Sequence, residues 1–231
     1  MPTFLYYDTE TTGLKSDKDR IFELAAFDPV QNRTFCELIH PGVPLSAETT
    51  ALCGVTDAML EGKPNFTEVG KAFIEFCGPD AILIAHNNER FDKLFLEAEF
   101  ARCGLTLPSW RYLDTLKWSR KYRPDLPSHA LQNLREVYGI PANQAHRALD
   151  DVIVLHQIFS TMIDDLSIEM VLKLLEDNPD SQRMPFGKFQ GRLLTEVPVS
   201  YVKWLSESGA LSKPENKSLK EAFIKHKMIT P

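Results

Sequence analysis

The chain has 231 residues, of which 43% are hydrophobic and 25% are charged, a composition typical of a globular protein large enough to bury a core. No apolar run approaches the ~20 residues that span a bilayer, and the N-terminus lacks the basic and apolar regions of a signal peptide. The four cysteines include no C-x-x-C pair, which argues against a zinc knuckle or a disulfide framework. We therefore expect a cytoplasmic protein with reduced cysteines and no membrane association.

Charge is distributed unevenly along the chain. The net charge of -6 argues weakly against a protein that binds nucleic acid by bulk electrostatics alone. Residues 1–179 have a net charge of -10, whereas residues 180–231 have a net charge of +4. Bound divalent cations would make the acidic region less negative than this count suggests.

The expected elements begin with three strands, over residues 3–8, 21–28 and 33–39, separated by turn-forming stretches as in an antiparallel meander. After a loop rich in Pro, Gly and Ser, the patterns predict a helix over 65–78 ending at Gly78, a buried strand over 81–86 and a helix over 91–103. An edge strand with its turn over 112–116, a helix with Ser128 as its N-cap and a long helix over 147–163 are predicted to follow. This order indicates an α/β domain with a mixed sheet over residues 1–165.

The composition changes after Asp164. Residues 166–182 are predicted to form a short helix and a linker that leads into "NPDSQR" (178–183). Residues 183–231 are predicted to form a small basic module that begins near "MPFGKFQGRLL". The aromatic residues of the module (Phe186, Phe189, Tyr201 and Trp204) are candidates for base stacking. The alternative, which we favour for these rings, is that they form the core of the module.

The stretch "FLYYDTETTGL" (residues 4–14) begins as a buried strand and ends in Asp8 and Glu10. Side chains alternate along a strand, so these two carboxylates point the same way if the strand continues to Glu10. Two carboxylates at the end of a strand suit Mg²⁺ or Mn²⁺, which prefer oxygen ligands. A polar turn that only closes the strand is an equal alternative at this point.

A second acidic position follows the apolar strand, in "AHNNERFD", where Asp92 begins a helix. A carboxylate in the first turn of a helix is ordinarily explained by the helix dipole, which it stabilises by at most ~1 kcal/mol. Taken alone, this segment, including Phe91, is more typical of a structural role than of a catalytic one.

The third acidic position lies in "HRALDDVIVLHQIFSTMI", where helical spacing puts Asp151 beside the apolar stripe and Asp150 on a different face. A charged carboxylate on an inward face costs several kcal/mol unless it is paired or binds metal. Arg147 is a candidate partner through an i, i+4 ion pair. His146 lies just upstream, and a group that titrates near neutrality beside metal-bound carboxylates suits a general base that takes a proton from water.

These patterns occur together in one order: D-x-E at 8–10, N-x-x-F-D at 88–92 and H-x-x-x-x-D at 146–151. In this respect the chain resembles the histidine-containing branch of the DEDD superfamily of 3′-to-5′ exonucleases, which includes proofreading subunits of bacterial DNA polymerase III. "TTGL" after Glu10, "CGVTDAML" at 53–60 and "SHALQNLREVYGI" before His146 extend the resemblance over about residues 3–160. "MPFGKFQGRLLTEVPVSYVKWL" (184–205) looks like the C-terminal module of exonuclease X-like members.

The resemblance implies a ribonuclease H-like fold, with a mixed five-stranded sheet flanked by helices, and a small C-terminal module. It also implies hydrolysis that releases nucleoside monophosphates from DNA 3′ ends that are single-stranded or frayed. Asp8, Glu10, Asp92 and Asp151 would hold two Mg²⁺ ions roughly 3.5 to 4 Å apart, with Mn²⁺ as a substitute. His146 would be the catalytic general base, contributing about 10² to 10⁴ in rate.

The same resemblance assigns substrate contacts to Thr9, Thr11, Leu14, Asn88 and Phe91. The chain departs from the family pattern at two positions. His86 lies one residue further from Asp92 than the histidine of the usual H-N-x-x-F-D motif, which leaves its role open. Cys53 replaces a frequent histidine, and we interpret it as a packing residue.

Three other functions stay open. RNA or short oligoribonucleotides are an alternative substrate, because the catalytic residues do not discriminate sugars. The N-terminal stretch also resembles the D-x-D-x-T start of haloacid-dehalogenase phosphatases, although Glu10 in place of the second aspartate argues against it. A non-catalytic, metal-stabilised nucleic-acid-binding module is the third alternative. The sequence leaves open the pathway (proofreading, DNA repair or turnover) and the oligomeric state, with a homodimer as one alternative.

Overall fold

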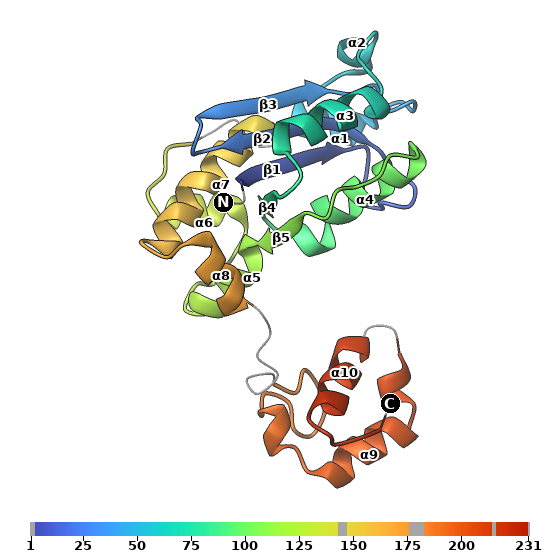
Figure 1. Cartoon of the computed structure of the whole chain (residues 1–231), viewed down its shortest axis with the longest axis vertical. Coiled ribbons are helices and arrows are strands. Elements are labelled where there is room, and N and C mark those ends of the chain that lie inside the picture. The colour runs from blue at the N-terminus through green and yellow to red at the C-terminus, as the bar shows by residue number, and fades with distance from the viewer. Residues whose placement is uncertain (1–2, 143–146, 176–182, 214–215, 231) are drawn as a thin grey trace. The chain divides into compact units, whose positions relative to one another are not determined.

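The computed structural model describes residues 3–142, 147–175, 183–213 and 216–230, and the chain divides into two compact units, Met1–Val171 and Leu172–Pro231 (Figure 1). The first unit extends past the predicted boundary at residue 165 because helix α8 (Ile168–Leu175) begins against it. Arg111 forms an ion pair with Glu169 of α8 at 2.7 Å. Within the described part of the chain, no helix is long and apolar enough to span a bilayer.

The first unit contains the predicted mixed five-stranded sheet, in the order β3-β2-β1-β4-β5 (Figure 1). Its strands are β1 (Phe4–Thr11), β2 (Ile21–Asp28), β3 (Arg33–Leu38), β4 (Ile82–Ala85) and β5 (Arg111–Asp114). The first three strands are antiparallel, whereas β4 is parallel to β1 and β5 is parallel to β4. The carboxyl ends of β1 and β4 therefore meet at one edge of the sheet.

Strand β1 is longer than the predicted 3–8. Its pairing with β2 continues through Asp8 opposite Ala25 and Glu10 opposite Glu23, and the register shifts only between Glu10 and Thr11. Strand geometry thus persists to Glu10, which was the condition for Asp8 and Glu10 to share a face.

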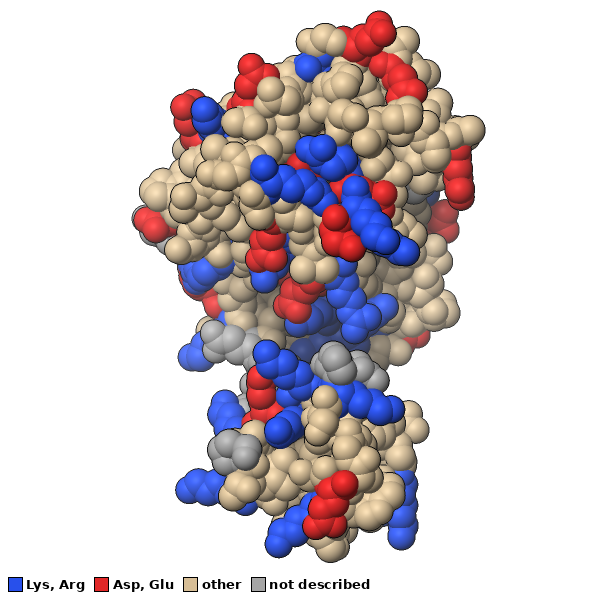
Figure 2. Space-filling model, turned by 90° about the vertical axis from the view of Figure 1, so that its right-hand side faces the viewer, with Lys and Arg blue, Asp and Glu red and all other residues tan. Residues whose placement is uncertain are grey.

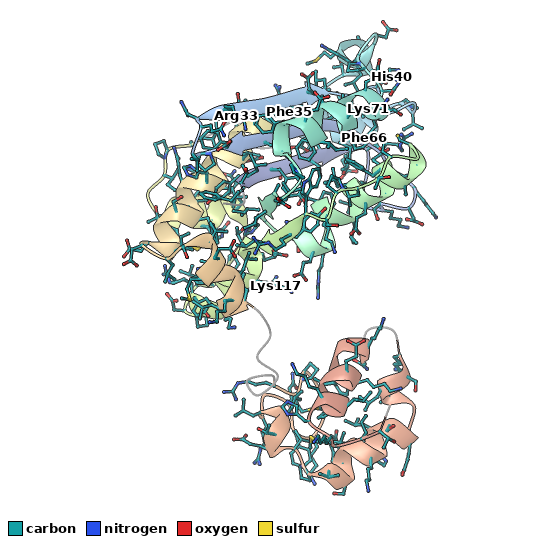
Figure 3. All side chains as sticks on the ribbon, in the orientation of Figure 1. Arg33, Phe35, His40, Phe66, Lys71 and Lys117 are labelled. Atoms are coloured by element: carbon teal, nitrogen blue, oxygen red, sulfur yellow. The ribbon has the colours of Figure 1, made fainter. Side chains whose placement is uncertain are left out.

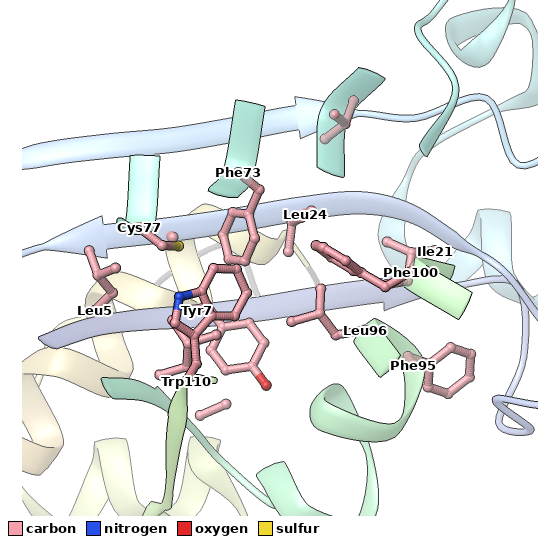
Figure 4. Packing of buried hydrophobic residues seen from close by; sticks show 14 of the residues in the cluster. Leu5, Tyr7, Ile21, Leu24, Phe73, Cys77, Phe95, Leu96, Phe100 and Trp110 are labelled. Atoms are coloured by element: carbon pink, nitrogen blue, oxygen red, sulfur yellow. The ribbon is translucent and has the colours of Figure 1, made fainter. Parts of the chain in front are cut away.

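Two helical layers cover the sheet. The helices α3 (Phe66–Cys77) and α4 (Asp92–Arg102) bury one face, together with Leu5 and Tyr7 of β1 (Figure 4). Phe66, labelled in Figure 3, packs edge-on against Phe100 with ring centroids 5.6 Å apart. On the other face, Tyr6 of β1 packs against Phe159 of α7 (Ala148–Ile163), with centroids 6.4 Å apart.

Helix boundaries follow local capping where the capping signals are strong. Asn65 and Glu68 form a capping box at the start of α3, and Gly78 ends it with φ of 75°. The prediction of Ser128 as an N-cap is wrong: α6 (Leu131–Val137) begins after Ala130, and the Ser128 hydroxyl accepts from the Ala130 N–H at 3.4 Å outside the helix. The remaining helix of this region is α5 (Thr115–Tyr122).

The segment predicted as a loop between β3 and α3 contains two short helices, α1 (Ala47–Cys53) and α2 (Asp57–Leu60). They were missed because helices this short show no apolar periodicity. Cys53 is buried beside Phe22, Leu45 and Val55, as expected of a packing residue.

The second unit is helical, with α9 (Val199–Glu207), α10 (Lys217–Lys225), and the short turns η3 (Leu194–Glu196) and η4 (Ala210–Ser212). Leu194, Val202, Leu205 and Phe223 are among the residues of its core, and Phe186, Phe189 and Tyr201 pack against it partly buried. The preferred interpretation of the aromatic residues is therefore confirmed for these three rings. It is wrong for Trp204, which is 55% exposed.

Candidate active site

Three carboxylates converge at the carboxyl end of β1. An oxygen from each of Asp8, Glu10 and Asp151 lies within 4.8 Å of the other two. Asp8 and Glu10 share the face of β1 that Tyr6 presents to α7, because side chains alternate along a strand. Asp151 is in the first turn of α7 and is 9% exposed. The structure thus brings Asp151 next to Asp8 and Glu10, although Asp151 is 141 positions from Glu10 in the sequence.

The proposed ion pair between Arg147 and Asp151 was the structural alternative to metal binding. The Arg147 guanidinium forms its ion pair with Glu23 instead, with Nη2 3.3 Å from Oε1. Asp151 Oδ1 accepts a hydrogen bond from the Gln132 amide at 3.3 Å. This neutral amide donor orients the Asp151 carboxylate.

Asp92 occupies the first turn of α4, as predicted, and is 2% exposed. Its Oδ1 accepts from the Thr9 N–H at 3.1 Å and from the Thr9 hydroxyl at 2.9 Å. Thr9 points away from the face that holds Asp8 and Glu10, so these bonds bind α4 to β1 just behind the three clustered carboxylates. Asp92 lies close enough for its charge to raise the pKa of Asp8, second only to burial as a cause.

Burial and mutual repulsion raise the pKa values of carboxylates in this cluster. Burial, followed by the charges of Asp151 and Glu23, raises the pKa of Glu10 to about 8. Burial raises the pKa of Asp92 to about 7, against the lowering effect of the Thr9 hydrogen bonds. The pKa of Asp8 is raised well above its usual range by burial and then by the charges of Asp92 and Glu10. Buried carboxylates that raise one another's pKa are unfavourable in their charged forms at neutral pH, and a bound cation would offset this cost.

The donor set fits a hard divalent cation. The clustered ligands among the described residues are carboxylate oxygens, which suit Mg²⁺ or Mn²⁺ better than zinc or copper, whose preferred ligands are thiolates and imidazoles. Glu23 is paired with Arg147. The charge of Arg147 lowers the pKa of Glu10, against the raising effects of burial and of the neighbouring carboxylates, Glu23 among them. Asp8, Glu10 and Asp151 are therefore the residues that would hold the metal, with Asp92 beside them.

A cleft of about 500 Å³ opens onto the acidic cluster. It is lined by the predicted metal ligands Asp8, Glu10 and Asp151, by the predicted substrate contacts Thr9, Thr11, Leu14 and Phe91, and by Thr12, Gly13, Ser46, Glu48, Thr49, Leu52 and Cys53. Leu14 is 84% exposed at its rim. The structure thus brings four of the five predicted substrate residues to the same cleft as the acids.

Asn88, the fifth predicted substrate residue, is fully buried. Its amide donates to the carbonyl oxygens of Leu83 and Leu113, both at 3.1 Å, and its Oδ1 accepts from the Tyr7 hydroxyl. Asn88 therefore ties β4 and β5 together behind the cleft, a position that is structural and out of reach of a substrate in the cleft.

The segment that leads into Asp92 is fixed by further side chains. Asp114 at the end of β5 accepts from the N–H groups of Asn87 at 3.1 Å and of Glu89 at 3.2 Å, and Lys117, labelled in Figure 3, forms an ion pair with Glu89. His86 bonds the Thr115 hydroxyl at 2.9 Å and the His129 carbonyl oxygen at 2.8 Å. Both ring nitrogens of His86 are therefore engaged in contacts that connect the end of β4 to Thr115 and His129, which is a structural role.

His146, the predicted general base, lies outside the described residues, so its role stays a prediction. Two residues of the site, Glu23 and Gln132, were missed by the sequence analysis. "IFELAAFD" does contain a signal for Glu23, because a glutamate in a mostly apolar strand requires a partner. Gln132 gives no such signal, because an amide on a half-buried helix is ordinary.

Comparison with known proteins agrees with this geometry. A profile of the family described as "Exonuclease" matches residues 5–159, and one described as "Putative quorum-sensing-regulated virulence factor" matches residues 174–217. The DNA polymerase III subunit epsilon of Treponema pallidum is 38% identical over 165 residues, which are 69% of this chain and 76% of that protein. The PolC-type DNA polymerase III of Caldanaerobacter subterraneus subsp. tengcongensis is 32% identical over 193 residues, 79% of this chain but only 14% of that protein.

Solved structures support the fold. A zinc-bound complex of E. coli exonuclease I with single-stranded DNA superposes with a TM-score of 0.63 at 22% identity, over 78% of this chain and 46% of that one. Exonuclease X in complex with 5′-overhanging duplex DNA gives 0.58 at 21% identity, over 74% of this chain and 99% of that one. These likenesses confirm the ribonuclease H-like sheet.

The fold and the carboxylate cluster define a nuclease domain of the ribonuclease H-like type. The chain belongs to the Exonuclease family.

Proposed function

We propose that this protein removes nucleoside monophosphates from DNA 3′ ends with the help of divalent metal, Mg²⁺ in the cell and Mn²⁺ as a substitute. The observation that supports it most directly is the convergence of Asp8, Glu10 and Asp151 within 4.8 Å at the floor of the cleft. Both relatives described above are named as DNA polymerase III proteins, and both structural neighbours are complexes with DNA, which favours DNA over RNA.

Each residue of the site has a distinct task. Bound divalent metal would lower the pKa of a water and stabilise charge on the departing 3′ oxygen. The negative charges of Asp8, Glu10 and Asp151 would bind the metal, and Asp92 is the fourth acid of the family pattern. Gln132 orients Asp151, and the Thr9 hydrogen bonds orient Asp92. His146 accepts the proton of the attacking water.

The 3′ end would enter along Thr9, Thr11 and Leu14. Thr11 and Thr12 come at the end of β1, where the Thr11 hydroxyl donates to the Gly13 carbonyl oxygen at 2.6 Å and the Thr12 N–H to the Arg20 carbonyl oxygen at 2.9 Å. These bonds fix the loop that presents Leu14. Phe91 packs on Phe95 with ring centroids 4.9 Å apart and also lines the cleft, so a terminal base in the cleft would contact Leu14 and Phe91.

The decisive experiment is a 5′-labelled single-stranded DNA assay with Mg²⁺. We expect a ladder of shortening products that is abolished by chelator, by Asp8→Asn and by His146→Ala. Asp150→Asn is the matched control, because Asp150 lies on a different face of α7 from Asp151. Activity of Asp8→Asn equal to that of the unchanged protein would overturn the proposal, and faster cleavage of a matched RNA strand would move it to an RNA substrate.

A further inference from the structure

Trp204 is the one exposed tryptophan in a chain that buries the other two. Trp110 and Trp118 are 6% and 3% exposed, whereas Trp204 is 55% exposed. The core of the C-terminal unit closes around Leu194, Val202 and Phe223 without it. Tryptophan has the largest apolar surface of any side chain and is usually mostly buried, so its exposure here requires an explanation other than the packing of the unit.

Trp204 belongs to a row of three rings. It stacks on Tyr201, one turn earlier on α9, with centroids 5.4 Å apart and planes 26° apart. Tyr201 in turn meets Phe189 edge-on at 4.8 Å. We name Phe189, Tyr201 and Trp204 the aromatic row.

The aromatic row is held in place at its centre. The Tyr201 hydroxyl accepts from the Lys188 N–H at 3.3 Å, and a Cβ at Gly187 would come within 2.5 Å of the same oxygen. Gly187 also has φ of +79°, a conformation that favours glycine. The turn around Gly187 therefore fits closely over Tyr201, and Trp204 stacks on a fixed partner.

Positive charge borders the aromatic row. Lys188 Nζ and Arg192 Cζ lie 5.7 Å and 5.8 Å from the centre of the Phe189 ring. Residues 180–231 have a net charge of +4, and Lys and Arg outnumber Asp and Glu on the face of this unit that Figure 2 shows. Stacking rings next to cations match a chain of bases joined by phosphates, because every base has a face to stack and every linkage has a negative charge.

We propose that the aromatic row is a binding surface for single-stranded nucleic acid, in which Trp204 stacks on a base while Lys188 and Arg192 contact phosphates. The inference rests on the proposed function, since it gives that function a second contact with its substrate. A strand held by this unit is tethered to the exonuclease unit, which raises the effective concentration of its 3′ end at the cleft.

The test uses the full chain in EDTA, so that binding is measured without cleavage. Fluorescein-labelled dT oligonucleotides of increasing length are titrated with protein and followed by anisotropy. We expect Trp204→Ala to weaken binding of a long oligonucleotide about tenfold, and Trp204→Phe to retain most of the affinity. Val199→Ala, which trims another exposed apolar residue of α9 (48% exposed), is the matched control and should bind as the unchanged protein does.

Two further measurements separate the proposal from its rivals. Lys188→Gln with Arg192→Gln should reduce the slope of log K against log salt by about 1.4. Unlabelled dT should quench intrinsic fluorescence of the unchanged protein, and this response should be lost in Trp204→Phe, because the other two tryptophans are buried. Equal affinity of Trp204→Ala and Val199→Ala for long dT would overturn the proposal and leave protein contact as the use of this surface. Intact binding without nuclease activity would instead refute the proposed function alone.

Discussion

Glu10 and Glu23 face each other across the antiparallel pairing of β1 and β2. Like charges in directly opposed positions of a sheet are destabilising, and here Glu23 is 1% exposed. Arg147, from just before α7, forms the ion pair that compensates Glu23. The acidic site is thus possible partly because its neighbouring glutamate has a cation of its own.

Loss of Arg147 should therefore harm the fold more than loss of Glu23. Arg147→Gln leaves a buried carboxylate without its cation, and we expect it to lower the free energy of unfolding by about 3 kcal/mol. Glu23→Gln removes the charge that needed compensation and should cost less. In the double variant the two losses should fail to add, with a coupling of about 0.5 to 3 kcal/mol. Urea unfolding of the metal-free proteins measures all four free energies, and strict additivity would show that the pair is not energetically coupled.

Removal of a clustered carboxylate should separate stability from activity. Asp8→Asn relieves repulsion with Asp92 and Glu10, so we expect the metal-free protein to become more stable at pH 8. Its exonuclease rate should fall by more than the ~10- to 100-fold typical of residues that only support a metal ligand. Thermal unfolding in EDTA and a DNA cleavage assay test the two parts, and a melting temperature below that of the unchanged protein would contradict the account of repulsion.

The metal-free protein should lose stability as pH rises. Glu10 has a folded pKa of about 8, above its unfolded value near 4.5, so the folded state binds more protons between these values and stability falls across that window. Asp92, with a folded pKa of about 7, acts in the same direction. The rise in melting temperature on addition of Mg²⁺ should accordingly be larger at pH 8 than at pH 5.5. An Mg²⁺ effect that is the same at both pH values would disprove this linkage.

Thr9→Val should shift the pH dependence of the exonuclease. Valine matches threonine in shape but removes the hydroxyl that donates to Asp92 Oδ1 at 2.9 Å, a bond that favours the ionised carboxylate. The pKa of Asp92 should rise further, and the acidic limb of the rate profile in Mg²⁺ should move to higher pH. Thr11→Val is the control, because the Thr11 hydroxyl donates to a backbone carbonyl. Identical acidic limbs for Thr9→Val and the unchanged protein would contradict this role.

Several features could be predicted because their signals are local. The strand 21–28 was predicted with the bounds that the structure gives to β2, since it is a mostly apolar run between turns, interrupted by Glu23. Asp151 was identified because helical spacing placed a carboxylate beside the apolar stripe of α7. The spacing of Asp8 and Glu10 required only that β1 remain a strand.

Other features depend on which elements become neighbours. The sequence by itself determined the residue types, the strand that presents Asp8 and Glu10, and the demand of Asp151 for a partner. Only the tertiary structure decided that Arg147 pairs with Glu23, that Gln132 orients Asp151, that Asn88 is buried and that Trp204 is exposed. The physical reason is that periodicity fixes the face of an element on which a side chain lies, whereas its partner is set by long-range packing between elements far apart in the chain.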